Sequence, residues 1–147
     1  MKSFIAAVLV CFIMPVFAQS DIEGYWVTID DETNKPKSIV ELKVVQGKVE
    51  GTIVKLYPRP GRPDDPVCEE CEDHRKGKKI VGMKIVEGLY KKGSEYKGGE
   101  ILDPANGKIY SCKIWLSDSN KNQLNVRGYL GPFYRTQKWI RFTGKND

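Results

Sequence analysis

The feature that most constrains the fold is a repeated alternation of apolar and polar residues in short segments separated by turn residues. Residues 38–45 show it most clearly, with three apolar side chains on one face and two charged ones on the other: Val40, Leu42 and Val44 against Glu41 and Lys43. Successive side chains of a strand point to opposite faces, so this pattern predicts a half-buried β-strand. Gln46 and Gly47 then supply a tight turn, and residues 49–57 return as the hairpin partner.

Short strand patterns of this kind fill the chain beyond its first twenty residues, and none of it shows a long helical periodicity. The predicted strands are residues 24–29, 38–45, 49–57, 80–86, 98–102, 108–116, 123–130 and 135–142. This arrangement predicts an all-β fold, an eight-stranded up-and-down antiparallel barrel, because closure removes the exposed edges of a meander. A β-sandwich is the alternative that the same strand spacing allows. A barrel of eight strands encloses packed side chains or one small ligand.

The first residues have the pattern of a secretory signal peptide. Lys2 gives a positive start, residues 4–17 are apolar, and the small residue Ala18 ends the run. The run is shorter than the roughly 20 apolar residues that a membrane-spanning helix needs. We therefore expect residues 1–18 to be removed and residues 19–147 to form a single β-barrel domain without a transmembrane segment. The mature protein is expected to be exported, either to the periplasm or out of the cell.

The charge balance does not point to a nucleic-acid partner. The chain has 24 basic and 19 acidic residues, a formal net charge of +5, and the two signs alternate rather than forming a basic block. A modest positive balance of this kind mainly favours solubility. Export makes nucleic acid a still less suitable partner.

One long segment, residues 58–79, lacks a strand pattern. It holds four prolines, Cys68, Cys71 and the only histidine of the chain, His74. Loops longer than about 12–15 residues are uncommon in compact domains and are often functional. This loop is therefore the first place to look for a functional site.

The Cys68-x-x-Cys71 motif in this loop has three interpretations. In an exported protein a disulfide comes first, although so short a ring is worth only about 2 kcal/mol. A redox-active pair comes second, but the acidic flanks disfavour a thiolate and no helix is predicted beside the motif. Zinc bound by these cysteines, His74 and Cys112 comes third, although Cys112 lies on the apolar face of a predicted strand, where a thiol packs as a buried residue.

No catalytic constellation accompanies these residues. Any Ser–His–Asp or Cys–His arrangement would have to use His74, which lies in a charged loop. We therefore predict that the protein is not an enzyme and has no catalytic residues, metal ligands or cofactor. Aromatic and charged residues that could contact a ligand or a partner protein are Tyr57, His74, Arg127, Tyr129 and Trp139.

Five separated motifs, spread over essentially the whole expected mature chain, resemble a known bacterial family. They are Gly24-x-Trp26, Cys68-x-x-Cys71, Gly98-Gly99-x-Ile101-x-Asp103-Pro104-x-Asn106-Gly107-Lys108-x-Tyr110-x-Cys112, Val126-Arg127-Gly128-Tyr129 and Thr136-Gln137-x-Trp139-x-Arg141. In this order they resemble the family known as domain of unknown function 2147. The resemblance implies a small exported protein without an established activity.

At the level of the fold, the chain is also similar to the lipocalins and related calycin barrels. Those barrels open with Gly-x-Trp on the first strand and carry an arginine near the last strand that packs over the tryptophan. The resemblance implies that Trp26 and Arg141 close one end of the barrel by a cation–π contact, with Arg127 as the alternative arginine. The lipocalin habit of binding small hydrophobic molecules is an analogy of fold only.

Three functional hypotheses follow from these observations. The first is non-enzymatic binding of a small apolar or amphipathic ligand inside the barrel. The second is an envelope module that contacts another protein through the Cys68-x-x-Cys71 loop. The third is a thiol- or zinc-dependent enzyme that uses the same residues.

Overall fold

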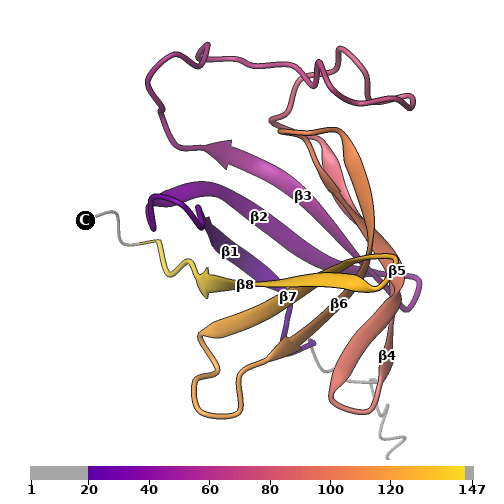
Figure 1. Cartoon of the computed structure of the whole chain (residues 1–147). Helices are drawn as coiled ribbons and strands as arrows, with labels where there is room; N and C mark the ends of the chain where they lie inside the picture. The colour runs from indigo at the N-terminus through magenta and orange to yellow at the C-terminus, as the bar shows by residue number, and fades with distance from the viewer. Residues whose placement is uncertain (1–19, 145–147) are drawn as a thin grey trace, which may run out of the picture.

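The computed structural model describes residues 20–144, and within them the chain forms eight antiparallel strands (Figure 1). Each strand pairs with its neighbours in sequence and the last pairs with the first, so the sheet closes into a barrel. The predicted eight-stranded up-and-down barrel is confirmed, and the β-sandwich alternative is wrong. The strands are β1 (Gly24–Ile29), β2 (Pro36–Val45), β3 (Lys48–Leu56), β4 (Lys84–Lys92), β5 (Glu95–Asp103), β6 (Lys108–Leu116), β7 (Gln123–Leu130) and β8 (Phe133–Arg141).

The β2–β3 hairpin illustrates how the local sequence produces this sheet. Gln46 and Gly47 have φ values of 50° and 76°, the left-handed values that a two-residue type I′ turn needs at both positions. On β2, Val40 and Leu42 are buried while Lys43 is exposed. The alternation read in the sequence therefore decides which face of the strand points into the barrel.

The interior is filled unevenly along the barrel axis. At one end, called the base below, the odd-numbered strands begin and the even-numbered strands end. Large side chains pack the base completely: Trp26, Leu42, Val49, Leu89, Ile114 and Leu124 are all fully buried. The opposite end, called the mouth below, is where the odd-numbered strands end and the even-numbered strands begin.

A long irregular segment, residues 57–83, connects β3 to β4 at the mouth end of the barrel. In Figure 1 it runs above β3 and reaches the turn between β5 and β6. Its regular structure is limited to one isolated bridge between Val67 and Lys79. The predicted loop, residues 58–79, lies within this segment.

The predicted fourth strand, residues 80–86, was placed too early. Ile80 and Met83 look like strand residues, but the Met83 N–H donates to the Ile80 carbonyl and Gly82 has a φ of 90°, so the chain turns there. The strand begins at Lys84 and continues to Lys92. Its second half reads as polar in the sequence because it extends beyond the buried part of the sheet.

The predicted starts of four further strands were also too late, by one residue in β3, two in β2 and β8, and three in β5. β5 begins at Glu95 rather than at residue 98, because the strand continues through Gly98, whose φ is 80°, with an irregular register on β6. β8 begins at Phe133 rather than at residue 135, and it ends at Arg141. Glycine and turn-like residues inside these strands conceal their full length in the sequence.

Two expectations concern membrane topology and export. No helix within residues 20–144 is long and apolar enough to cross a membrane. The predicted signal peptide, residues 1–18, lies outside the described residues.

Candidate ligand-binding site

A cavity of about 300 Å³ occupies the mouth half of the barrel. Side chains from β3, β4, β5 and β7 give it an apolar wall, formed mainly by Ile53, Ile85, Ile101 and Val126. Small-molecule sites in proteins typically measure about 300–1,000 Å³ and are mostly apolar. The volume is about twice that of an engineered apolar cavity that binds benzene.

The opposite wall of the cavity, formed by β8, β1 and β2, carries hydrogen-bonding groups. The hydroxyl oxygens of Thr28 and Ser38 lie 2.6 Å apart, and both residues are buried. Gln137 on β8 lines the same wall, next to the buried Trp139. The cavity therefore has an apolar side and a polar side, which suits an amphipathic molecule better than a plain alkane.

The base of the barrel is closed by an arginine stacked on a tryptophan. The guanidinium carbon of Arg141 lies 4.2 Å from the ring centroid of Trp26. The same guanidinium donates hydrogen bonds to the carbonyl oxygens of Glu23 and Asp21, at 3.2 and 2.8 Å. Trp26 Nε1 donates to the Ile22 carbonyl at 2.9 Å. These contacts fasten the N-terminal turn and the last strand together and close the base of the barrel.

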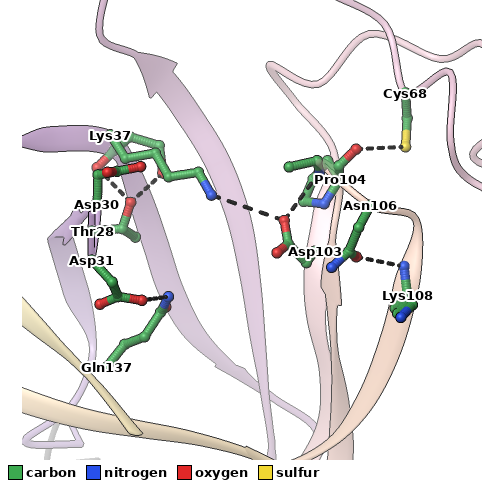
Figure 2. A network of polar contacts seen from close by, with 12 residues as sticks. Thr28, Asp30, Asp31, Lys37, Cys68, Asp103, Pro104, Asn106, Lys108 and Gln137 are labelled. Carbon is green, nitrogen blue, oxygen red and sulfur yellow. Dashed lines mark hydrogen bonds and ion pairs between the residues drawn. The ribbon is translucent and has the colours of Figure 1, made fainter. Parts of the chain in front are cut away.

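Charged and polar side chains make contacts at the mouth, and Figure 2 shows Lys37 with Asp103 and Asp31 with Gln137. Lys37 Nζ lies 3.9 Å from Asp103 Oδ1, which joins the start of β2 to the end of β5. Asp31, in the β1–β2 loop, accepts a hydrogen bond from Gln137 at 3.0 Å and forms an ion pair with Arg135. These residues form the boundary between the apolar interior and the solvent.

A further pair ties the long segment to the β1–β2 loop. Asp30 accepts hydrogen bonds from the N–H and the hydroxyl of Thr33, both at 2.9 Å, and from Arg59 Nη2 at 2.7 Å. Donation from Thr33, followed by that from Arg59, holds the pKa of Asp30 well below its usual range. Asp30 therefore stays ionised and connects two loops beside the mouth.

Cys68 and Cys71 form a disulfide, and both residues are fully buried. The ring packs on the β5–β6 turn, with Cys68 Sγ 3.6 Å from the Pro104 carbonyl oxygen (Figure 2). Gly107 lies so close to this ring that a Cβ there would overlap the Glu70 carbonyl oxygen. The loop is thus a packed part of the barrel rather than a free projection, and its two cysteines are shielded from solvent.

Arg75 anchors the long segment, residues 57–83, to the start of β4. It is only 6% exposed, its Nη2 donates to Asp73 Oδ2 at 2.6 Å, and its Nη1 donates to the Lys84 carbonyl at 3.1 Å. The hydrogen bonds from Arg75 lower the pKa of Asp73 to about 2. A buried guanidinium needs such partners, because leaving it unpaired away from water is costly.

The predicted contact residues lie in different parts of the molecule. Trp139 lines the cavity, and Tyr57 and His74 do not. Tyr57 is half-buried just after β3, and the Lys55 ammonium lies 5.2 Å from its ring centroid. His74 is exposed and borders a shallow basic depression beside Lys78 and Lys84.

Arg127 and Tyr129 lie on the outer face of β7. The Arg127 guanidinium lies 5.1 Å from the Trp115 ring centroid and 4.5 Å from that of Tyr134. The rings of Tyr129 and Tyr134 are 5.9 Å apart. Arg127 is therefore occupied outside the barrel, and the arginine that stacks on Trp26 is Arg141.

The cysteine and histidine residues proposed for zinc are not assembled into a site. Cys68 and Cys71 are oxidised to each other, whereas Cys112 is a buried free thiol on β6. Burial raises the pKa of the Cys112 thiol to about 12, so it is neither a good ligand nor a nucleophile. Among residues 20–144, no group of three or more His, Cys, Asp or Glu side chains is placed to hold a metal ion.

Most of the cavity residues were not singled out in the sequence. Tyr110 lies two residues from the inward-facing Cys112, and Val126 and Leu130 are an even number of residues apart, so alternation is the signal that could have found them. No comparable signal marks Thr28, Ser38 or Lys37, and Asp103 is marked in the sequence only as part of a family motif. Thr28 and Ser38 pair directly across the consecutive strands β1 and β2, whereas Lys37 and Asp103 meet because the sheet curves into a barrel.

A closed eight-stranded barrel with a plugged base and one open cavity defines a lipocalin-like protein. A solved structure with this arrangement bears the description "Protein HP1028 from the human pathogen Helicobacter pylori belongs to the lipocalin family". It superposes on this chain with a TM-score of 0.68 at 19% sequence identity, covering 83% of each chain. At this identity the likeness concerns the fold.

The chain belongs to the family described as uncharacterized protein conserved in bacteria, domain of unknown function 2147. The family model matches residues 24–141, from the first residue of β1 to the last residue of β8. No curated protein matches the sequence at a significant level. Family and fold leave both the activity and the ligand open.

Proposed function

We propose that this protein is exported and binds a small apolar or amphipathic ligand in the mouth cavity of its barrel, without catalysis. The observation that carries the proposal is the uneven filling of the interior. Trp26 and its neighbours pack the base completely, whereas the mouth half leaves about 300 Å³ between apolar side chains. Native cores contain few voids larger than a water molecule, so a cavity of this size with an opening indicates a site.

Export is proposed from two features. The N-terminal residues have the pattern of a cleaved signal peptide, with Lys2 before an apolar run that ends at Ala18. A disulfide between Cys68 and Cys71 suits an oxidising compartment. Intact mass of the protein purified from the host envelope tests both: a chain that begins at Gln19 and lacks two hydrogens supports the proposal. An uncleaved, reduced chain contradicts export.

Ligand binding can be tested with the uncharged fluorescent probe N-phenyl-1-naphthylamine and a matched pair of substitutions. Ile101 on β5 lines the cavity, whereas Ile109 on β6 is 38% exposed and does not. The wild-type mature chain should bind the probe with saturable enhancement of its fluorescence. Ile101→Trp fills the cavity and should weaken binding at least tenfold, while Ile109→Trp should change it less than twofold.

The outcome that refutes the proposal is equal binding by Ile101→Trp and the wild type, because the probe would then lie outside the cavity. Absence of saturable binding to the wild type refutes it as well. Circular dichroism of both variants establishes that each keeps the barrel. The comparison therefore reports on the cavity and not on folding.

A further inference from the structure

The ion pair between Lys37 and Asp103 has a geometry unlike the other charge pairs near the mouth. Its N–O separation of 3.9 Å is long, compared with 2.7 Å between Arg59 and Asp30. Its two side chains come from β2 and β5, which are separated in the barrel by β3 and β4. Figure 2 shows the Lys37 side chain extended toward Asp103. The pair therefore bridges the opening that a ligand must use.

Lys37 and Asp103 differ in what else holds them. Asp103 Oδ1 accepts the Ala105 N–H at 3.0 Å, so the carboxylate is fixed within the β5–β6 turn whether or not Lys37 is present. The Lys37 ammonium has three donors, and within residues 20–144 its recorded ionic partner is this one distant carboxylate. Lys37 is therefore the member that can change partner.

The other basic side chain that lines the cavity, Arg135, and the nearby Arg59 are already engaged. Arg59 is bound to Asp30, and Arg135 is paired with Asp31. Lys37 thus supplies the exchangeable positive charge at the cavity, and its side chain is 30% exposed. Both members of the pair also line the cavity, next to the hydroxyl wall of Thr28 and Ser38.

We propose that the cavity selects amphipathic anions, whose carboxylate, sulfonate or phosphate head displaces Asp103 as the partner of Lys37 while the apolar part lies against the isoleucine wall. The inference rests on the proposed ligand-binding function and adds the chemical class of the ligand. Asp103 then acts as a built-in competitor that occupies Lys37 in the empty protein. A charge-assisted hydrogen bond to an incoming anion is stronger than the long contact that it replaces.

Two fluorescent probes with the same ring system separate the contribution of an anionic head group to binding from the contribution of the apolar part. 1-Anilinonaphthalene-8-sulfonate carries an anionic group, and N-phenyl-1-naphthylamine is the same ring system without it. Lys37→Met should weaken sulfonate binding about five- to tenfold and leave the uncharged probe within twofold. Lys37→Arg should restore most of the affinity. Lys108→Met is the matched control, because Lys108 is an exposed lysine that does not line the cavity.

Asp103→Asn gives a second signature that a structural role would not produce. It removes the competing carboxylate, so sulfonate binding should strengthen about two- to fivefold while binding of the uncharged probe is unchanged. Raising the salt concentration from 0.05 to 0.5 M should weaken the sulfonate probe alone, since a partly exposed charge pair is screened.

Each alternative result has a definite meaning. If Lys37→Met weakens both probes equally, Lys37 shapes the cavity rather than binding the head, and the inference is wrong. The inference is also wrong if Asp103→Asn weakens sulfonate binding, or if neither substitution changes the ratio of the two affinities. If the uncharged probe binds in the cavity in any of these cases, the proposed function stands without the anion preference. If neither probe binds the wild type, the proposed function itself fails.

Discussion

Replacing Arg141 tests how the base of the barrel is held closed. Arg141→Leu removes a guanidinium that stacks on Trp26 at 4.2 Å and donates to the carbonyl oxygens of Glu23 and Asp21. A cation–π contact of this kind is worth about 1 kcal/mol, and hydrogen bonds from a charged donor in a partly exposed position add a similar amount. We expect the free energy of unfolding to fall by about 2–3 kcal/mol.

The assay is equilibrium unfolding in urea at pH 7, followed by tryptophan fluorescence, on the mature chain. Arg141→Lys keeps the positive charge but loses the planar fork, so it should lose about half as much stability as Arg141→Leu. Lys138→Leu, an exposed change on the same strand, should stay within about 0.5 kcal/mol of wild type. The m-value, which is the slope of the free energy of unfolding against urea concentration, should be unchanged in all three variants.

The reasoning is refuted if Arg141→Leu is as stable as Lys138→Leu. It is also refuted if Arg141→Lys matches the wild type, since a bare charge would then suffice and stacking would be irrelevant. Probe binding gives a separate check. The cavity lies at the mouth, so the affinity of Arg141→Leu for N-phenyl-1-naphthylamine should equal that of the wild type while the barrel remains folded.

Three further predictions concern the packed segment and the interior. Gly107→Ala should expose residues 74–79 to trypsin, because its Cβ overlaps the Glu70 carbonyl, whereas Gly131→Ala, with a similar φ but open space around it, should not. The pKa of Asp73 is about 2, below its usual 3.8. Its carboxylate therefore stabilises the fold above about pH 4, and this contribution is lost as the pH falls toward 2. Urea unfolding of Asp73→Asn across that range should accordingly show a flatter pH dependence than wild type. Cys112, with a pKa raised to about 12, should resist Ellman's reagent at pH 8 in the native mature chain and react fully once unfolded; a reactive native thiol contradicts its burial.

The architecture was predictable from the sequence because alternation over short segments is a local signal. Residues 24–29, 108–116 and 123–130 were predicted with the bounds that the structure shows. The errors have a common cause. Ile80 and Met83 are apolar because they pack against the core from the end of the long segment. The second half of β4 is polar because Tyr90, Lys91 and Lys92 are exposed. Composition therefore misled the prediction at both places.

The candidate site was less predictable than the fold. Trp139 was singled out as a contact residue and lines the cavity, whereas His74 drew attention only because it is the sole histidine and lies on the surface. Of the rim pair, Lys37 was not singled out in the sequence, and Asp103 appeared only as part of a family motif, without a role. Their pairing depends on the curvature of a closed sheet, and no local pattern encodes it.

The double pairing of β8 has a consequence for incomplete chains. β8 covers the open edges of both β7 and β1, whereas β2 to β7 pair only with their neighbours in sequence. A chain that stops at Leu130 retains seven strands but exposes two unpaired edges, which are templates for aggregation. It also lacks Arg135, Gln137 and Trp139, three residues that line the cavity. A premature stop late in the gene should therefore give an insoluble product rather than a weakened binding protein.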